Sequence, residues 1–114
     1  GTGMSILRKD IKAYHYMIGF LGGDTIKCST FALPGSQELS DAALKALKGR
    51  KACLLANHGA ITCGKNLDEA MFLTEEFEIL CKQITIAKLN GTPHSVEKKH
   101  LKKIIEAIKM YGKY

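Results

Sequence analysis

The sequence contains no tryptophan, only two prolines and no long apolar run. A membrane-spanning helix needs roughly 18 continuous apolar residues, whereas the most apolar stretch, around Met71, is interrupted by Glu75, Glu76 and Glu78. A charged and then apolar leader does not open the chain. We therefore expect a cytoplasmic protein that binds no membrane, and we interpret residues 1–3 as a cloning remnant.

Cysteine is also scarce, with four residues: Cys28, Cys53, Cys63 and Cys81. Their spacing resembles no framework of a small disulfide-bonded secreted domain. We predict free and mostly buried thiols in a reducing compartment. Cys53, His58 and Cys63 are evenly spaced, but structural zinc sites have close pairs separated by a long gap, so we predict no zinc site there.

Acidic residues are fewer than basic ones, 11 against 17, and the net charge is +6. About half of the basic residues follow residue 81. The basic residues of the predicted last helix lie together with the acidic residues Glu97 and Glu106. Binding of single-stranded nucleic acid would need aromatic stacking platforms among the basic residues, and none alternate with them here. We interpret this region as a solvated helix face, and predict no nucleic-acid partner.

The length of 114 residues fits one domain. The hydrophobic fraction of 46% and the charged fraction of 25% are ordinary for a globular protein. No internal repeat or low-complexity linker divides the chain. The sequence therefore predicts a single domain over residues 1–114.

The first half of the chain predicts a strand, then a second strand or extended segment, and then a helix. Residues 13–20 are rich in β-branched and aromatic residues and predict the strand, and residues 26–33 predict the second segment; turn residues follow each of them. Ser36 is expected to cap a helix that ends near Gly49. The apolar positions expected to share one face of this helix are Leu39, Ala43, Leu44 and Leu47.

The second half predicts two strands and two helices. Residues 52–56 read as a buried central strand and residues 60–63 as another, with His58 at the bend between them. Asn66 is expected to cap a long helix that reaches Asn90, with Glu69 as its capping-box partner. Ser95 is expected to cap the last helix, whose apolar stripe comprises Leu101, Ile104, Ile105 and Ile108. This order of elements predicts a layered α/β domain.

Five segments, in this order and spacing, resemble a known family. They are residues 10–18 (DIKAYHYMI), 22–26 (GGDTI), 35–40 (GSQELS), 47–60 (LKGRKACLLANHGA) and 66–70 (NLDEA). Together they are similar to the second half of the class II aldolase and adducin family, most of all to its fuculose-phosphate aldolases. The resemblance extends from about Arg8 to Tyr111. It implies a partial α/β/α sandwich, the carboxyl-terminal half of an aldolase domain truncated at its amino terminus.

The resemblance implies a zinc-dependent lyase that cleaves a carbon–carbon bond of a sugar phosphate. Zinc would stabilise the enediolate formed in such a cleavage. In the family, three histidines hold the zinc, two from a His-x-His motif and one from a segment like Asn57-His58-Gly59, and a carboxylate lies nearby. Of these ligands only His58 is present, whereas a catalytic zinc site needs about three from protein. We therefore expect this chain alone to bind zinc weakly or not at all, and to be inactive.

Two tyrosines complete the residues that the resemblance singles out. Tyr16 matches a tyrosine that reaches the active site at a subunit boundary, and Tyr111 resembles a tail tyrosine that donates a proton near the substrate. A phenol with a pKa near 10 can donate a proton in this way. The alternative for both is a residue at the end of a core element with a solvated hydroxyl. A histidine at a turn, such as His58, is likewise most often a hydrogen-bonded turn residue.

Three functions remain open at this point. The chain is half of an aldolase, as a fragment or as one part of a split enzyme. Alternatively it is a non-catalytic interaction module, as in the adducin branch, or a relative that epimerises a sugar phosphate. Because the resemblance implies a sheet built from both halves, we expect an uncovered strand edge, a homo-oligomer, and the amino-terminal half as a further partner.

Overall fold

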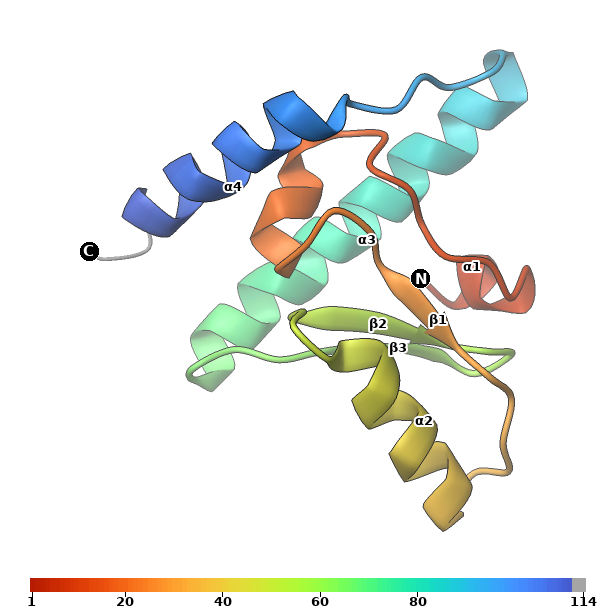
Figure 1. Ribbon diagram of the computed structural model, residues 1–114. Coiled ribbons are helices and arrows are strands. Elements are labelled where there is room, and N and C mark those ends of the chain that lie inside the picture. Colours follow the sequence, from red (N-terminus) through yellow and green to blue (C-terminus); the bar gives the residue numbers. More distant parts are fainter. Residues whose placement is uncertain (112–114) are drawn as a thin grey trace.

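The computed structural model describes residues 1–111, and of Tyr111 the backbone alone. The chain forms a three-stranded sheet with helices on both faces (Figure 1). The elements are α1 (Thr2–Ile6), the 3₁₀ helix η1 (Tyr16–Leu21), β1 (Lys27–Ser29), α2 (Gln37–Leu47), β2 (Ala52–Leu55), β3 (Gly59–Thr62), α3 (Leu67–Asn90) and α4 (Lys98–Tyr111). Within the described residues, no helix is long and apolar enough to cross a membrane.

The sheet has the strand order β1-β2-β3, which places β2 in the centre. β1 pairs with β2 in parallel and β2 pairs with β3 in antiparallel orientation. All four residues of β2 are buried, as a strand covered on both faces requires. The prediction of a central strand at residues 52–56 is confirmed, and so is the following strand.

Two apolar clusters lie on the opposite faces of the sheet, and they make the fold an α/β/α sandwich (Figure 1). On one face, Cys53 and Leu55 pack against α2 through Ala43 and Ala46. On the other face, Leu54 packs into the larger core, to which α3 and α4 contribute. The buried residues of that core on the two helices are Leu73, Phe77, Leu80, Cys81, Ile84 and Leu101. The predicted fold class is confirmed.

Two of the predicted helix caps are formed. The Ser36 hydroxyl accepts a hydrogen bond from the Leu39 backbone amide at 3.1 Å, and Asn66 Oδ1 accepts one from the Glu69 amide at 2.8 Å. Each side chain satisfies an amide that the first turn of the helix leaves free. The Glu69 carboxylate does not complete the capping box, because it bonds Lys51 at 3.2 Å.

The strand predicted for residues 13–20 is wrong. Residues from Tyr16 onward form η1, and the His15 side chain caps it by accepting a hydrogen bond from the Met17 amide at 3.2 Å. Ile18 and Leu21, three positions apart, are both buried in the larger core. A 3₁₀ helix places residues three apart on one side, whereas a strand would turn them to opposite faces.

The prediction of a second strand or extended segment over residues 26–33 is confirmed in part, since β1 lies within it and Ile26 forms an isolated bridge to Ile11. Two further expectations need correction. Leu44 does not share the buried face of α2, because its side chain is 68% exposed. Ser95 does not cap the last helix, which begins at Lys98. Before that point the Val96 amide donates to the Ala13 carbonyl oxygen at 2.7 Å, and this tertiary bond keeps the chain extended.

All four cysteines are free thiols, as predicted. Cys53 and Cys81 are buried, Cys28 is half-buried and Cys63 is exposed. Burial raises the pKa of the Cys53 thiol to about 11, and it raises the pKa values of the Cys28 and Cys81 thiols as well. The buried thiols are therefore protonated and unreactive at neutral pH.

Candidate functional site

The turn between β2 and β3 carries His58, the residue that the sequence singles out as a metal ligand. Its backbone amide donates a hydrogen bond to the Leu55 carbonyl oxygen at 2.9 Å, which closes the turn, and its side chain is exposed. Asn57 beside it has a φ of 57°, in the left-handed region that asparagine tolerates better than most residues. The predicted placement of His58 at a bend between two strands is confirmed.

The amino-terminal segment holds this turn in place (Figure 1). The Asn57 amide donates to the Ser5 carbonyl oxygen at 3.0 Å, and Ser5 in α1 is completely buried. Arg8, directly after α1, donates from Nε to the Asn57 side-chain oxygen, and its guanidinium lies 5.4 Å from the centre of the Phe31 ring. Arg8 itself has a φ of 53°. Two left-handed residues thus contact each other next to His58, and strained backbone of this kind clusters at functional sites.

The donor set at this turn is incomplete for a catalytic metal. Among residues 1–111, no three histidine, cysteine, aspartate or glutamate side chains lie close enough together to hold an ion. His58 therefore supplies one ligand where a catalytic zinc site needs about three. Cys53 cannot join it without rearrangement, since its thiol is buried under α2 while His58 is exposed. The residues present here do not fit zinc by themselves.

The first residues of the chain lie against the same turn. A β-carbon placed on Gly59 would stand 3.7 Å from the Thr2 hydroxyl oxygen. The terminal amine of Gly1 donates to a carboxylate oxygen of Glu78 in α3 at 2.7 Å. A chain segment docked beside α1 would therefore be near His58.

Tyr16, the first predicted catalytic residue, opens η1 and is 52% exposed. Its ring stacks on His15 with 4.9 Å between the ring centres. η1 packs on α3 and α4, whereas the turn with His58 packs against α1 at the end of the sheet (Figure 1). The structure therefore does not bring Tyr16 and His58 into one site within this chain.

Tyr111, the second predicted catalytic residue, is the last residue of α4. Its side chain lies outside the described residues, so its predicted role as a proton donor stays a prediction. The preceding turn of α4 lies within the described residues, and its residues Ile108 and Lys109 line a pocket.

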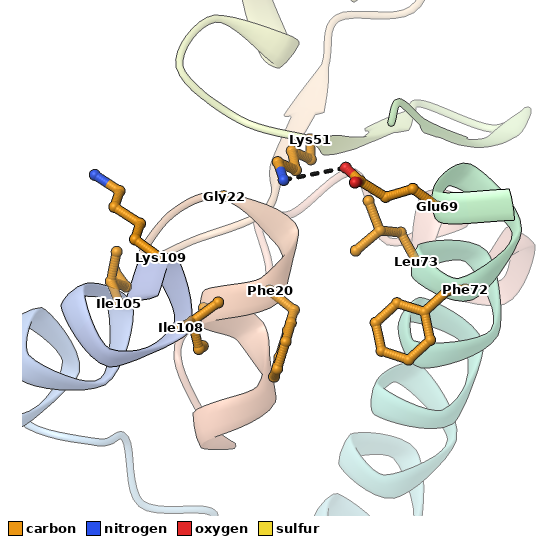
Figure 2. A pocket seen from close by; sticks show the side chains of 10 residues that line it. Phe20, Gly22, Lys51, Glu69, Phe72, Leu73, Ile105, Ile108 and Lys109 are labelled. Atoms are coloured by element: carbon orange, nitrogen blue, oxygen red, sulfur yellow. Dashed lines mark hydrogen bonds and ion pairs between the residues drawn. The ribbon is translucent and has the colours of Figure 1, made fainter. Parts of the chain in front are cut away.

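That pocket, which the sequence did not indicate, lies between η1, α3 and α4 (Figure 2). Its volume is about 420 Å³, and its walls are mostly apolar. At its rim Lys51 donates to the Glu69 carboxylate, and this hydrogen bond is the main cause that lowers the pKa of Glu69. Glu69 was interpreted from the sequence as a capping partner only. No local pattern reveals this pocket, because its residues come from four separate segments.

Comparison with known proteins gives one consistent family. Residues 1–85 match the family model described as the class II aldolase and adducin N-terminal domain. The chain is 38% identical over 112 residues to the L-fuculose phosphate aldolase of Escherichia coli K12, covering 97% of this chain and 52% of that protein. It is also 38% identical over 111 residues to a 5-methylthioribulose-1-phosphate/5-deoxyribulose-1-phosphate aldolase of Rhodospirillum rubrum, covering 97% of this chain and 50% of that protein.

A solved structure agrees with these relatives. An L-fuculose 1-phosphate aldolase superimposes with a TM-score of 0.91 at 35% identity, over 95% of this chain and 50% of that chain. The chain thus spans about half the length of the curated relatives that it matches.

Proposed function

The chain belongs to the class II aldolase and adducin family, and from that membership we propose that it is the carboxyl-terminal half of a sugar-phosphate aldolase. One observation carries the proposal. His58 is exposed on a turn that two left-handed residues and the buried Ser5 backbone hold in place. This geometry holds the backbone of His58 and leaves its side chain accessible, which supports a role as a metal ligand shared with another segment.

The proposed substrate is a ketose phosphate of the kind named in the relatives, such as fuculose phosphate. His58 would be one ligand of a zinc ion whose remaining ligands come from an amino-terminal half. The zinc, when bound, would supply the positive charge that stabilises an enediolate. Tyr111 is the proposed proton donor, and Tyr16 is the proposed catalytic residue that reaches the active site at a subunit boundary. We also propose that the protein is cytoplasmic.

Neither alternative is favoured. The named relatives are all aldolases, and no epimerase is among them. The relatives therefore favour an aldolase over an adducin-like interaction module as well.

Tyr16 and the His58 turn pack against different elements, and this supports an assembly of several copies. Since one chain holds the two residues in different parts of the fold, Tyr16 would serve a site whose histidine belongs to another copy. β3 is an edge strand, and such edges pair readily with further strands. We propose a homo-oligomer in which an amino-terminal half covers this edge.

A groove between α1 and α3 is a further surface that an added half or copy would cover. Its volume is about 750 Å³, and it includes Leu7, Ile79 and Ile86, whose side chains are about half exposed. Half-exposed apolar side chains gathered in one groove offer a surface that a partner would cover. Light scattering tests the assembly, since a stable monomer of 12.5 kDa at high concentration would contradict it.

Complementation tests the activity. The purified chain is mixed with a separately expressed amino-terminal half of the Escherichia coli relative, in the presence of zinc, and cleavage of L-fuculose phosphate is followed with a coupled assay. We expect no turnover from either half alone and turnover from the mixture. The His58→Ala variant should abolish it, whereas His94→Ala, which changes an exposed loop histidine, should not. Turnover by the isolated chain, or a mixture with H58A as active as wild type, would contradict the proposal.

A further inference from the structure

The long helix α3 carries apolar residues on two opposite sides. Its core side holds the buried residues Leu73, Phe77, Leu80, Cys81 and Ile84. Its outer side holds an apolar stripe whose side chains are 43% to 82% exposed: Met71, Phe72, Ile79, Ile86 and Leu89. A helix that is apolar all round is normally buried all round. The outer stripe of α3 therefore needs a cover that residues 1–111 of one chain do not supply.

Three residues of the outer stripe recur with the spacing of a helix–helix contact. Phe72, Ile79 and Ile86 follow one another at intervals of seven residues, which is about two turns of an α-helix. The neighbouring elements flank this line and leave it open. Met4 of α1 borders a groove together with Ile79 and Ile86, and the ring of Phe20 in η1 lies 5.9 Å from that of Phe72. A second helix can pack along the line at the usual axial distance of about 8–10 Å.

The charges of α3 are divided between its two ends. All acidic residues of the helix precede Ile79 and both of its lysines follow it, in the order Asp68, Glu69, Glu75, Glu76, Glu78, Lys82 and Lys88. A parallel partner helix of the same sequence would set acids against acids, whereas an antiparallel one sets acids against lysines. The charge pattern therefore favours an antiparallel second copy of α3.

Two of these charges lie beside the outer stripe. Glu75 comes three residues after Phe72, and Lys82 comes three residues after Ile79. Residues three and four apart share one face of a helix, so both side chains stand between the apolar residues of the line. Neither of them forms an ion pair within residues 1–111. Both charges are therefore available to a partner.

We propose that two copies of this chain associate through the outer stripes of their α3 helices, which run antiparallel about a two-fold axis beside Ile79. Phe72 and Ile86 each lie seven positions from Ile79, so the axis sets Phe72 against Ile86 of the second copy. Glu75 lies four positions before Ile79 and Lys82 three positions after it, so these charges also meet across the axis. Such a two-fold interface is self-complementary. This interface rests on the homo-oligomer proposed above and is independent of the aldolase activity.

Charge reversal tests the pairing on the whole chain. Glu75→Lys and Lys82→Glu each create two like-charged pairs in the proposed interface, because the two-fold axis repeats every contact. Sedimentation over a concentration series measures the dissociation constant of the dimer, which should rise by about tenfold or more in each variant. The double variant E75K/K82E restores opposite charges and should return close to wild type. Circular dichroism verifies that each variant is folded.

Two controls separate the interface from net charge. The single variants change the net charge in opposite directions, so a general charge effect cannot weaken both. Glu106→Lys makes the same change as E75K at an exposed position of α4 and should leave the dissociation constant unchanged. An equal mixture of E75K and K82E should form a heterodimer, because every contact then joins a lysine to a glutamate. A double variant that stays dissociated, or an E106K chain that is weakened as much as E75K, would overturn the proposed pairing.

Cross-linking locates the axis. Ile79→Cys is made in a Cys63→Ser background, because Cys63 is exposed. We expect a mild oxidant to join two copies at position 79. Leu44→Cys in the same background, at an exposed site of α2, is the control and should cross-link far more slowly. Equal rates for the two positions would contradict an axis beside Ile79.

The outcomes also separate this interface from the wider proposals. A stable oligomer that none of the α3 variants changes would keep the homo-oligomer and overturn the α3 interface. A monomeric wild-type chain would overturn both. If the amino-terminal half of the Escherichia coli relative releases the dimer and prevents cross-linking at position 79, the outer stripe belongs to that half and the proposal is wrong. Aldolase activity is tested independently by the complementation assay.

Discussion

Two parts of the molecule that carry predicted site residues are stabilised in different ways. The turn with His58 is fixed by a few polar contacts, chiefly from the Ser5 carbonyl and the Arg8 guanidinium to Asn57. The region of η1, where Tyr16 lies, is fixed by buried side chains such as Ile18, Leu21 and Phe77.

This difference separates a region that contributes much of the folding free energy from a turn that a few polar contacts fix. Apolar burial over many contacts contributes most of the folding free energy, whereas a few hydrogen bonds contribute about 1 kcal/mol each. The His58 turn can therefore change locally while the fold persists. A damaged core beside η1 would affect the whole chain.

The largest effect should follow from Phe77→Ala, in the core that supports η1. Phe77 is 1% exposed, and the deletion of a buried phenylalanine ring costs about 3–5 kcal/mol. Phe72→Ala on the same helix is the control, since Phe72 is 43% exposed, and it should cost about 1 kcal/mol or less. Urea unfolding followed by circular dichroism measures both. Equal losses would mean that the buried face of α3 is not the main support of the fold.

A smaller effect is expected from Asn57→Ala in the turn. Alanine is strained in the left-handed region by about 1–2 kcal/mol, and the hydrogen bond from Arg8 is lost as well. Asn57→Gly loses the same hydrogen bond but keeps the backbone conformation without strain. The unfolding free energy should fall further for N57A than for N57G. If the glycine variant is the less stable of the two, the turn is not strained in the way that its φ indicates.

Arg8→Met should act locally, with a loss of about 0.5 kcal/mol, as for other exposed charged contacts. We expect faster amide hydrogen exchange at Asn57 and His58, because the hydrogen bond from Arg8 to the Asn57 side chain is lost. Lys9→Met removes a neighbouring exposed charge and should leave this exchange unchanged. Exchange that quickens throughout the chain would show that Arg8 supports the core and not only the turn.

The smallest effect is a pH dependence at the rim of the pocket. The pKa of Glu69 is lowered in the folded chain, chiefly by its hydrogen bond to Lys51, so its contribution to stability is present above the ordinary glutamate pKa of about 4.3. That contribution is lost as the pH falls through the lowered value. Glu69→Gln should therefore be less stable than wild type at pH 7 and lose less stability between pH 5 and pH 3. Parallel pH profiles for the two proteins would contradict the pairing.

Much of the local structure could be predicted because it depends on residues close together in the chain. Ser36 and Asn66 cap their helices through the amide three positions ahead, and these contacts form before any tertiary packing is needed. Every residue of β2 is apolar, so neither face of this strand is suited to contact with water. Such a run indicates a central strand that is covered on both faces. The bend at His58 was predictable for the same reason, because Asn57, His58 and Gly59 stand between two short apolar runs. The family resemblance also rests on short segments such as this one.

Tertiary structure decided what these local patterns leave open. Whether residues after His15 form a strand or a 3₁₀ helix depends on Ile18 and Leu21 reaching one core, and the start of α4 depends on the bond from Val96 to the distant Ala13. The pocket between η1, α3 and α4 exists only where those segments meet. The separation of Tyr16 from His58 has the same origin, because the sequence specifies which residues are present, and packing between distant segments sets which of them come together.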